Sequence, residues 1–370
     1  MKVGFDIRPA LFDFAGIGRY VRELAVALTE LEEEGPFMEM FAPSWRGGRR
    51  TPVKLKGGHF RMNRGFLPGR LMNHLHRLPG LDAGRFPAKV DVFHWTDFTF
   101  PTVRSCATVM TLHDAAFAVN PTFHGWETSN LLDRVRNNLN QADIVIVPSK
   151  PSHDDAELLG VEPHQVRVIP HGVSPHFQRP VEKTEGKYLL SVGTMEPRKN
   201  YMRTLQAMEI AWDKDLAPDW VIIGGEGWDY GEFRRHMESS RHKDRIRWIP
   251  RATDEELLCY YQGALALIHA SLHEGFGLPV LEAMACETAV VVSDQTSAAW
   301  VAGDAGMRVN PREIDSIAEG IERICSEDWW RNHAANVLCR RAQDFTWKQT
   351  AKKTADAYAD AQKNFLRKRD

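Results

Sequence analysis

The chain has 370 residues, of which 43 % are apolar, and a formal net charge of −2. One hydrophobic core seldom serves a chain of this length, so we expect two domains. The balanced charge argues against nucleic acid as a partner. The five cysteines are odd in number and form no Cys-x-x-Cys pair, which argues against a disulfide framework and against a zinc cluster.

Neither a signal peptide nor a membrane span is expected. Asp6 and Arg8 interrupt the first apolar residues, and no run of 18 apolar residues could cross a bilayer. Because unpaired cysteines suit a reducing compartment, we expect a cytoplasmic protein, either free or bound peripherally to the inner face of the cell membrane.

Short β-branched runs alternate with helical patterns in the first half of the chain, and the alternation restarts after Gly172. This pattern predicts two parallel sheets with helices on both faces, an α/β fold of two Rossmann-like domains. We expect an amino-terminal domain at 1–180 and a carboxyl-terminal domain at 181–349, with a polar linker at 180–186. The expected strands are 2–7, 38–42, 90–94, 107–112, 143–147, 166–169, 188–192, 220–223, 246–249, 265–268, 289–292 and 307–309.

Two glycines, Gly16 and Gly18, open a helical pattern directly after the first expected strand. Such a pair often serves only to allow tight packing at the start of a helix. Its place in the first β–α loop favours close approach to a ligand phosphate or to an acceptor. Arg19, between them and the rest of the helix, could face ligand or solvent.

A basic and apolar region covers residues 46–89, with 11 Lys or Arg and a single acidic residue, Asp82. One interpretation is a solvated surface. The other is attachment to an anionic membrane or capture of a lipid-diphosphate acceptor, since basic residues near such a surface contribute about 1 kcal/mol each.

His113 and Asp114 follow the expected strand 107–112. The pair is compatible with a metal ligand, a general base or a structural contact. No third ligand has suitable spacing, so a metal is the weakest of these interpretations and we expect none.

Arg198 and Lys199 follow the expected strand 188–192 and Gly193, and a helical pattern begins near Asn200. One Arg side chain can bind two phosphate oxygens at once, and Lys adds a compact mobile charge. The alternatives are a surface pair and a binding site for phosphate groups.

The segment 274–282 places two carboxylates, Glu274 and Glu282, around a glycine-rich turn that opens into a helix at Pro279. Helix-opening N–H groups lack intrahelical partners and favour anionic phosphate. Two glutamates eight apart are common on solvated surfaces, but here both can face one ligand bound at the turn. The expected phosphate-binding residues of the turn are Gly275, Phe276, Gly277 and Leu278.

Together these segments resemble the retaining glycosyltransferases of family four, which have the GT-B fold. The resemblance extends over nearly the whole chain and is most like bacterial mannosyltransferases of surface-polysaccharide assembly. The matching motifs, in the family's order, are residues 16–20, 111–114, 147–149, 168–172, 192–200, 274–282 and 302–305.

The resemblance implies a role for each candidate residue in binding a nucleotide-diphosphate sugar. Glu274 would position the hexose, Glu282 would hold the ribose, and Arg198 with Lys199 would bind the diphosphate. Gly16, Gly18 and Gly193 would also belong to the donor site. His113 would reach the donor sugar from the amino-terminal domain, which also binds the acceptor. A last helix, 350–370, would return to that domain.

The implied reaction is metal-independent transfer of a hexose to a glycan or lipid-linked saccharide. The donor expected is GDP-mannose, with UDP-hexoses as the alternative. A non-catalytic nucleotide-sugar-binding scaffold is a further alternative, because the chain departs from the family pattern at two positions. Glu287 replaces a usual turn glycine, and Trp300 replaces a usual acidic residue near the donor. A glycan phosphorylase is disfavoured, because no lysine has the context of a pyridoxal-phosphate site.

Overall fold

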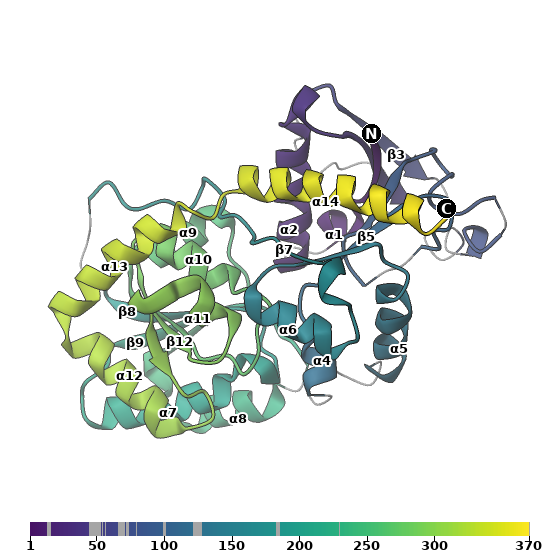
Figure 1. Cartoon of the computed structure of the whole chain (residues 1–370). Coiled ribbons are helices and arrows are strands. Elements are labelled where there is room, and N and C mark those ends of the chain that lie inside the picture. The colour runs from purple at the N-terminus through teal and green to yellow at the C-terminus, as the bar shows by residue number, and fades with distance from the viewer. Residues whose placement is uncertain are drawn as a thin grey trace. The chain divides into compact units, whose positions relative to one another are not determined.

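The computed structural model contains two compact units (Figure 1). The amino-terminal unit comprises Met1–Ala115, Glu127–Gly172 and Thr346–Asp370, and the carboxyl-terminal unit comprises Ala116–Trp126 and Val173–Phe345. The structure describes residues 1–369 apart from 13–15, 44–52, 54, 56, 66–70, 72–73, 79, 99–100, 121–127, 183–185 and 229.

The amino-terminal unit is built on a seven-stranded parallel sheet with the order β3-β2-β1-β4-β5-β6-β7. Its central strands are buried on both faces, as expected for a parallel sheet covered by helices. The strands are β1 (Lys2–Asp6), β2 (Phe37–Pro43), β3 (Phe60–Gly65), β4 (Val92–Trp95), β5 (Ala107–Thr111), β6 (Ile144–Val147) and β7 (Val166–Val168). All six strands predicted for this half are confirmed.

The edge strand β3 was not predicted. It lies inside the basic region 46–89, where the many charged residues made the short alternation of apolar Phe60 and Met62 hard to recognise. Both side chains pack against the core, and β3 pairs in parallel with β2. Much of the remaining region lies outside the described residues.

The helices of the amino-terminal unit bury apolar stripes against this sheet. They are α1 (Arg8–Phe12), α2 (Gly16–Thr29), α5 (Thr128–Leu139), α6 (Lys150–Leu158) and α14 (Trp347–Arg367), with the 3-10 turns η1 (Glu32–Glu34) and η3 (Pro163–Gln165). In α2 the buried residues Val21, Leu24 and Leu28 recur at helical spacing.

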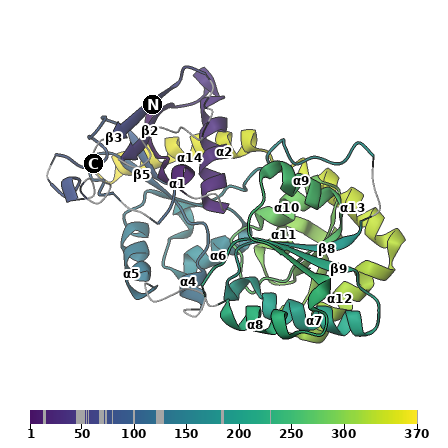
Figure 2. The same cartoon turned by 180° about the vertical axis from the view of Figure 1, so that it is seen from behind.

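The last helix, α14, belongs to the amino-terminal unit. It lies beside α2 in both views (Figures 1 and 2) and contacts β5 and β6. Thr346 caps its amino-terminal end, because the hydroxyl accepts from the N–H of Gln349 at 3.2 Å. Trp347 and Tyr358 are buried in the same core as β1 and β5. Among the described residues, no helix is both long enough and apolar enough to cross a bilayer.

The carboxyl-terminal unit is built on a six-stranded parallel sheet with the order β10-β9-β8-β11-β12-β13. The strands are β8 (Tyr188–Val192), β9 (Asp219–Ile223), β10 (Ile246–Ile249), β11 (Ala264–His269), β12 (Ala289–Ser293) and β13 (Met307–Val309). They confirm the second set of predicted strands.

Alternate residues of these strands face opposite sides of the sheet, so each face has its own core. Leu190, Val221 and Leu267 lie in one core, and their neighbours Leu189 and Trp220 lie in the other. Helices cover both faces (Figure 2): α9 (Asp254–Gln262), α10 (Leu278–Ala285), α11 (Ser297–Ala302) and α13 (Asp328–Ala342) on the first, and α7 (Tyr201–Asp213), α8 (Gly231–Ser239) and α12 (Ile314–Ser326) on the second.

Candidate functional site

The candidate site lies where the strand order of the carboxyl-terminal unit changes direction. Strands β8 and β11 are neighbours in the sheet although two other strands separate them in the sequence. Because they are parallel, the loops that follow them meet at one edge, where ligands of open α/β sheets bind. The loop after β8 contains the 3-10 turn η4 (Pro197–Lys199), and the loop after β11 contains Glu274.

The Glu274 carboxylate is held by three basic side chains. Its Oε1 atom lies 2.5 Å from Lys199 Nζ and 3.1 Å from His269 Nε2, and its Oε2 atom lies 3.1 Å from Arg198. Arg198 also contacts Glu196 at 2.7 Å. The side chain of Glu274 is 8 % exposed, and those of Arg198 and Lys199 are 17 % and 10 % exposed.

These contacts keep Glu274 ionised. Burial alone would raise the pKa of this carboxyl, but the Lys199 and Arg198 charges and the hydrogen bond from His269 hold it well below its usual range. The site therefore combines a fixed carboxylate with two cations that are partly open to solvent. Two such cations close to a helix start can receive a phosphate group.

The turn after Glu274 depends on a glycine. Gly277 has φ +100° and caps α10, and a Cβ atom there would lie 3.3 Å from Cα of Ala298. Other residues rarely adopt this conformation. The buried ring of Phe276 packs 6.0 Å from that of Phe345, while Leu278 begins α10 and is half-buried. Gly275 is buried beside them.

Glu282 occupies the buried face of α10, one turn beyond the helix start. Its Oε2 atom accepts a hydrogen bond of 2.8 Å from the hydroxyl of Tyr261 in α9. The two glutamates thus have separate partners on either side of the turn. A sequence pattern could not show that Tyr261 orients Glu282, because the two residues come from different helices.

Gly193 makes room for the stem of Lys199. It has φ +150°, and a Cβ atom there would lie 3.3 Å from Cε of Lys199. The carbonyl of Gly193 accepts a hydrogen bond of 2.8 Å from the hydroxyl of Tyr201. A side chain at this position would therefore disturb the lysine that pairs with Glu274.

Asn200 fixes the loop that carries Arg198 and Lys199, and sequence reasoning gave it no role. It has φ +60°, and its buried amide donates to the carbonyls of Ala270 at 2.9 Å and Pro311 at 2.7 Å. The signal for it was available, since Asn tolerates the left-handed conformation at a helix start. His269 was also missed, because it lies inside a run that reads as a buried strand.

The remaining candidates, Gly16, Gly18 and His113, belong to the amino-terminal unit. Gly16 begins α2 and is exposed, whereas Gly18 is buried. His113 follows β5, and its Nε2 atom lies 2.8 Å from the carbonyl oxygen of Thr96. That contact makes Nε2 the donor, so Nδ1 of the neutral ring is an acceptor.

The two residues that depart from the family pattern are Glu287, which follows α10, and Trp300, which lies in α11. Glu287 has φ +58°, the left-handed conformation that a glycine would adopt more easily, at the end of α10 remote from Gly277. The Trp300 ring packs 6.1 Å from Phe345 in the core, and the Trp300 carbonyl accepts from Arg341 at 3.0 Å. The Trp300 side chain is therefore part of the packing behind the turn.

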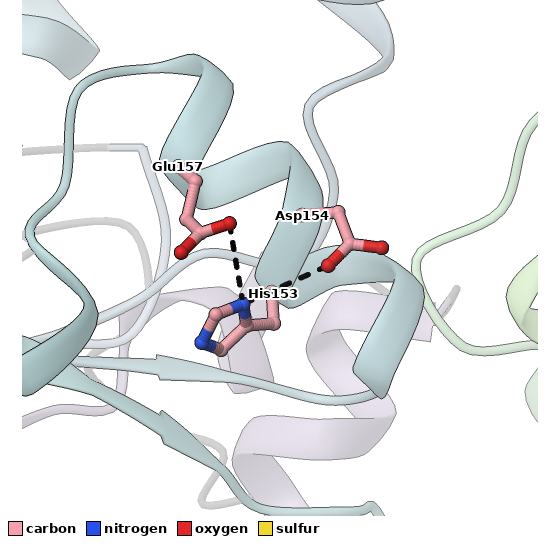
Figure 3. A group of neighbouring side chains, drawn as sticks. All are labelled: His153, Asp154 and Glu157. Carbon is pink, nitrogen blue, oxygen red and sulfur yellow. Dashed lines mark ion pairs between the residues drawn. The ribbon is translucent and has the colours of Figure 1, made fainter.

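A separate group of possible metal ligands lies on α6 (Figure 3). His153 Nδ1 is 3.7 Å from Asp154 and 3.9 Å from Glu157, and both carboxylates are well exposed. All three residues come from one helical turn. We interpret them as a surface ion-pair group, of a kind that contributes at most about 1 kcal/mol.

Comparison with known proteins identifies two family domains along the chain. Residues 14–177 match the model described as Glycosyltransferase Family 4, and residues 174–342 match the model described as Glycosyl transferases group 1. The chain is 29 % identical to O-antigen chain mannosyltransferase B of Escherichia coli over 97 % of this chain and 99 % of the relative.

A shorter match links the chain to GDP-mannose:cellobiosyl-diphosphopolyprenol alpha-mannosyltransferase of Xanthomonas oryzae. The identity is 26 % and covers 57 % of each protein. Among solved structures, sucrose-phosphate synthase from Thermosynechococcus elongatus superposes with a TM-score of 0.76 over 97 % of this chain and 98 % of that one, at 22 % identity. The chain therefore joins a Glycosyltransferase Family 4 domain to a Glycosyl transferases group 1 domain and is a glycosyltransferase of the GT-B fold.

Proposed function

We propose that the protein is a retaining hexosyltransferase that transfers mannose from GDP-mannose to a glycan or lipid-linked saccharide, without a metal ion. The observation that carries this proposal is the carboxylate of Glu274 held between Lys199 and Arg198 at the start of α10. A fixed carboxylate beside two cations suits a sugar that is attached to a diphosphate.

Binding of the donor begins at the diphosphate. The N–H groups of Gly277 and Leu278 at the start of α10 and the charges of Arg198 and Lys199 favour its oxygens. Negative charge grows on the leaving diphosphate as the sugar–phosphate bond breaks, and preorganised cations stabilise that charge most strongly in a site with little water. This step needs no charge beyond that of the protein's own side chains.

The two glutamates have different tasks in this proposal. Glu274 accepts hydrogen bonds from the hexose hydroxyls, and Glu282, held by Tyr261, accepts from the ribose. Retention follows a front-face route in which the leaving phosphate helps to deprotonate the acceptor. His113 is assigned to the donor sugar from its place in the family motif at residues 111–114.

Two relatives support the choice of mannose. The E. coli relative is named as a mannosyltransferase and is matched over 99 % of its length, and the name of the Xanthomonas relative gives GDP-mannose as donor and a diphosphopolyprenol-linked sugar as acceptor. A lipid-linked acceptor would also suit the basic region 46–89. Co-sedimentation with liposomes tests that part of the proposal: binding should rise with anionic lipid content, and unchanged binding would remove the membrane contact.

The experiment that tests the function compares thermal stabilisation by GDP, UDP and ADP. A ligand that binds the folded protein at 100 times its dissociation constant adds about 2.7 kcal/mol of stability. Selective stabilisation by GDP is the expected result, and selectivity for UDP would support a UDP-hexose donor. No response to any nucleotide would support a non-catalytic scaffold.

Transfer and stereochemistry need a second measurement. With GDP-mannose and a set of lipid-linked saccharides, the product should carry an α-linked mannose, the configuration of the donor, in its NMR spectrum. Formation of a β-linked product would contradict retention while leaving the transferase activity in place.

A further inference from the structure

We propose that His269 takes up a proton when the donor diphosphate binds Arg198 and Lys199, and that it then holds Glu274 in position; this inference rests on the proposed function. His269 would be a positioning residue, since it contacts Glu274 and acts on the donor through it.

His269 lies within a strand, whereas Lys199 and Arg198 lie on a turn in a loop. His269 is the last residue of β11 and pairs in register with Val292 of β12, and its side chain is 3 % exposed. Lys199 and Arg198 lie on the short turn η4 and have longer, more exposed side chains. A phosphate can therefore draw the two cations outward more easily than it can move His269.

Glu274 shares one oxygen between two of these partners. Lys199 and His269 both contact Oε1, at 2.5 and 3.1 Å. When Lys199 turns to the diphosphate, His269 remains the partner of that oxygen. A neutral imidazole gives one hydrogen bond, whereas an imidazolium also compensates the carboxylate charge.

The charged groups around His269 explain why it is neutral before the donor binds. Burial lowers the pKa of His269, and the Lys199 and Arg198 charges lower it further, while Glu274 raises it. Tyr201 lines the same small cavity as His269, and Glu196 acts through its pair with Arg198. In the free site, the positive charges of Lys199 and Arg198 are therefore balanced by the negative charges of Glu274 and Glu196.

Donor binding changes the net charge around His269 and so raises its pKa. The diphosphate of a nucleotide sugar brings two negative charges to Arg198 and Lys199, so the cations no longer oppose a charge on His269. A proton from solvent then adds to the ring nitrogen that does not already carry one. Because the complex binds more protons than the free protein, donor affinity should increase as pH falls.

Isothermal titration calorimetry measures this proton directly. GDP-mannose is titrated at pH 6, 7 and 8 in two buffers of different ionisation enthalpy. Both of its phosphates are esterified, so the donor itself does not titrate in this range. We expect net proton uptake for the wild type and an association constant that rises as pH falls, by at most about tenfold per pH unit for one proton.

Two variants separate the proposal from a structural effect. His269→Gln keeps a donor for Glu274 but cannot be charged, and we expect it to bind without proton uptake and without the rise in association constant at low pH. His242→Gln is the matched control, because His242 pairs with Asp213 at 2.8 Å elsewhere in the same unit. It should retain the wild-type uptake.

The outcomes are distinguishable. Wild-type binding without proton uptake, or uptake that persists in His269→Gln, would overturn the inference and leave the proposed function intact. If neither GDP-mannose nor UDP-glucose binds the wild type, both the proposed function and the inference fail. If His269→Gln does not fold, the wild-type measurement in the two buffers still decides whether a proton is taken up.

Discussion

Lys199 and Glu274 are 75 residues apart in the sequence, yet Nζ of the lysine lies 2.5 Å from Oε1 of the glutamate. The contact exists because β8 and β11 are adjacent parallel strands whose following loops share an edge. Ligand binding at this edge must compete with an ion pair already present. Donor binding to Lys199 and the contacts of Glu274 are therefore linked.

Replacing Glu274 by Gln should lower kcat by about 100-fold or more, the magnitude typical of losing a preorganised polar group in an active site. The affinity for GDP should stay within about threefold, because Arg198 and Lys199 become free to bind phosphate. Steady-state kinetics and calorimetry measure the two effects. Glu322→Gln, on the surface of α12, is the control; equal losses of kcat and affinity would contradict the assigned role of Glu274.

Replacing Lys199 by Ala should weaken binding of GDP by at least about tenfold, since a hydrogen bond to a charged group contributes about 1.5–3 kcal/mol. Calorimetry with GDP measures the loss. The matched control is Lys214→Ala, because Lys214 pairs with Glu322 on the surface at 2.6 Å and should not affect binding. Unchanged affinity in Lys199→Ala would remove this lysine from the diphosphate site.

Replacing Gly277 by Ala should destabilise the turn by about 1–3 kcal/mol, the usual cost of a strained backbone conformation. At φ +100° the new Cβ atom would also press on Ala298. Differential scanning fluorimetry should show a lower Tm, by about 2–4 °C per kcal/mol. Gly231→Ala is the control, since no atom lies within 4 Å of a Cβ there. A Tm equal to that of the control would mean that the turn relaxes without strain.

His94 should make the amino-terminal unit less stable in acid. Its two ring nitrogens lie 2.8 Å from the hydroxyls of Tyr358 and Thr111, and burial lowers its pKa to about 3, with a smaller contribution from His113. The unfolded chain binds a proton below about pH 6.5, whereas folded His94 does not until about pH 3. The contribution of His94 to the free energy of unfolding is therefore complete above pH 6.5 and decreases as pH falls toward 3.

Urea unfolding between pH 7 and pH 4.5 measures this dependence. His94 should account for at most about 1.4 kcal/mol of lost unfolding free energy per pH unit. His94→Gln should reduce the slope by that amount, even if the variant is less stable overall. His164→Gln, at an exposed histidine of η3, should keep the wild-type slope. An identical slope in His94→Gln would show that this histidine does not stay neutral.

Much of the fold followed from local pattern. Twelve strands were predicted because buried β-branched runs alternate with helical spacing, and the structure confirms them. The strand β3 was not predicted, because an edge strand needs only half of its residues to be apolar, and the polar residues Arg61 and Asn63 alternate with Phe60 and Met62. The signal from Phe60 and Met62 was too short to separate from a basic surface.

The sequence by itself determined the glycine turn at Gly277 and the helix that follows it, since both depend on neighbours along the chain. It also placed Arg198, Lys199 and Glu274 at the ends of strands. The tertiary structure decided which strand ends meet: the order β9-β8-β11-β12 brings the two loops together and adds His269 beneath Glu274. Strand order depends on how the whole sheet packs its two cores, and no local pattern contains that information.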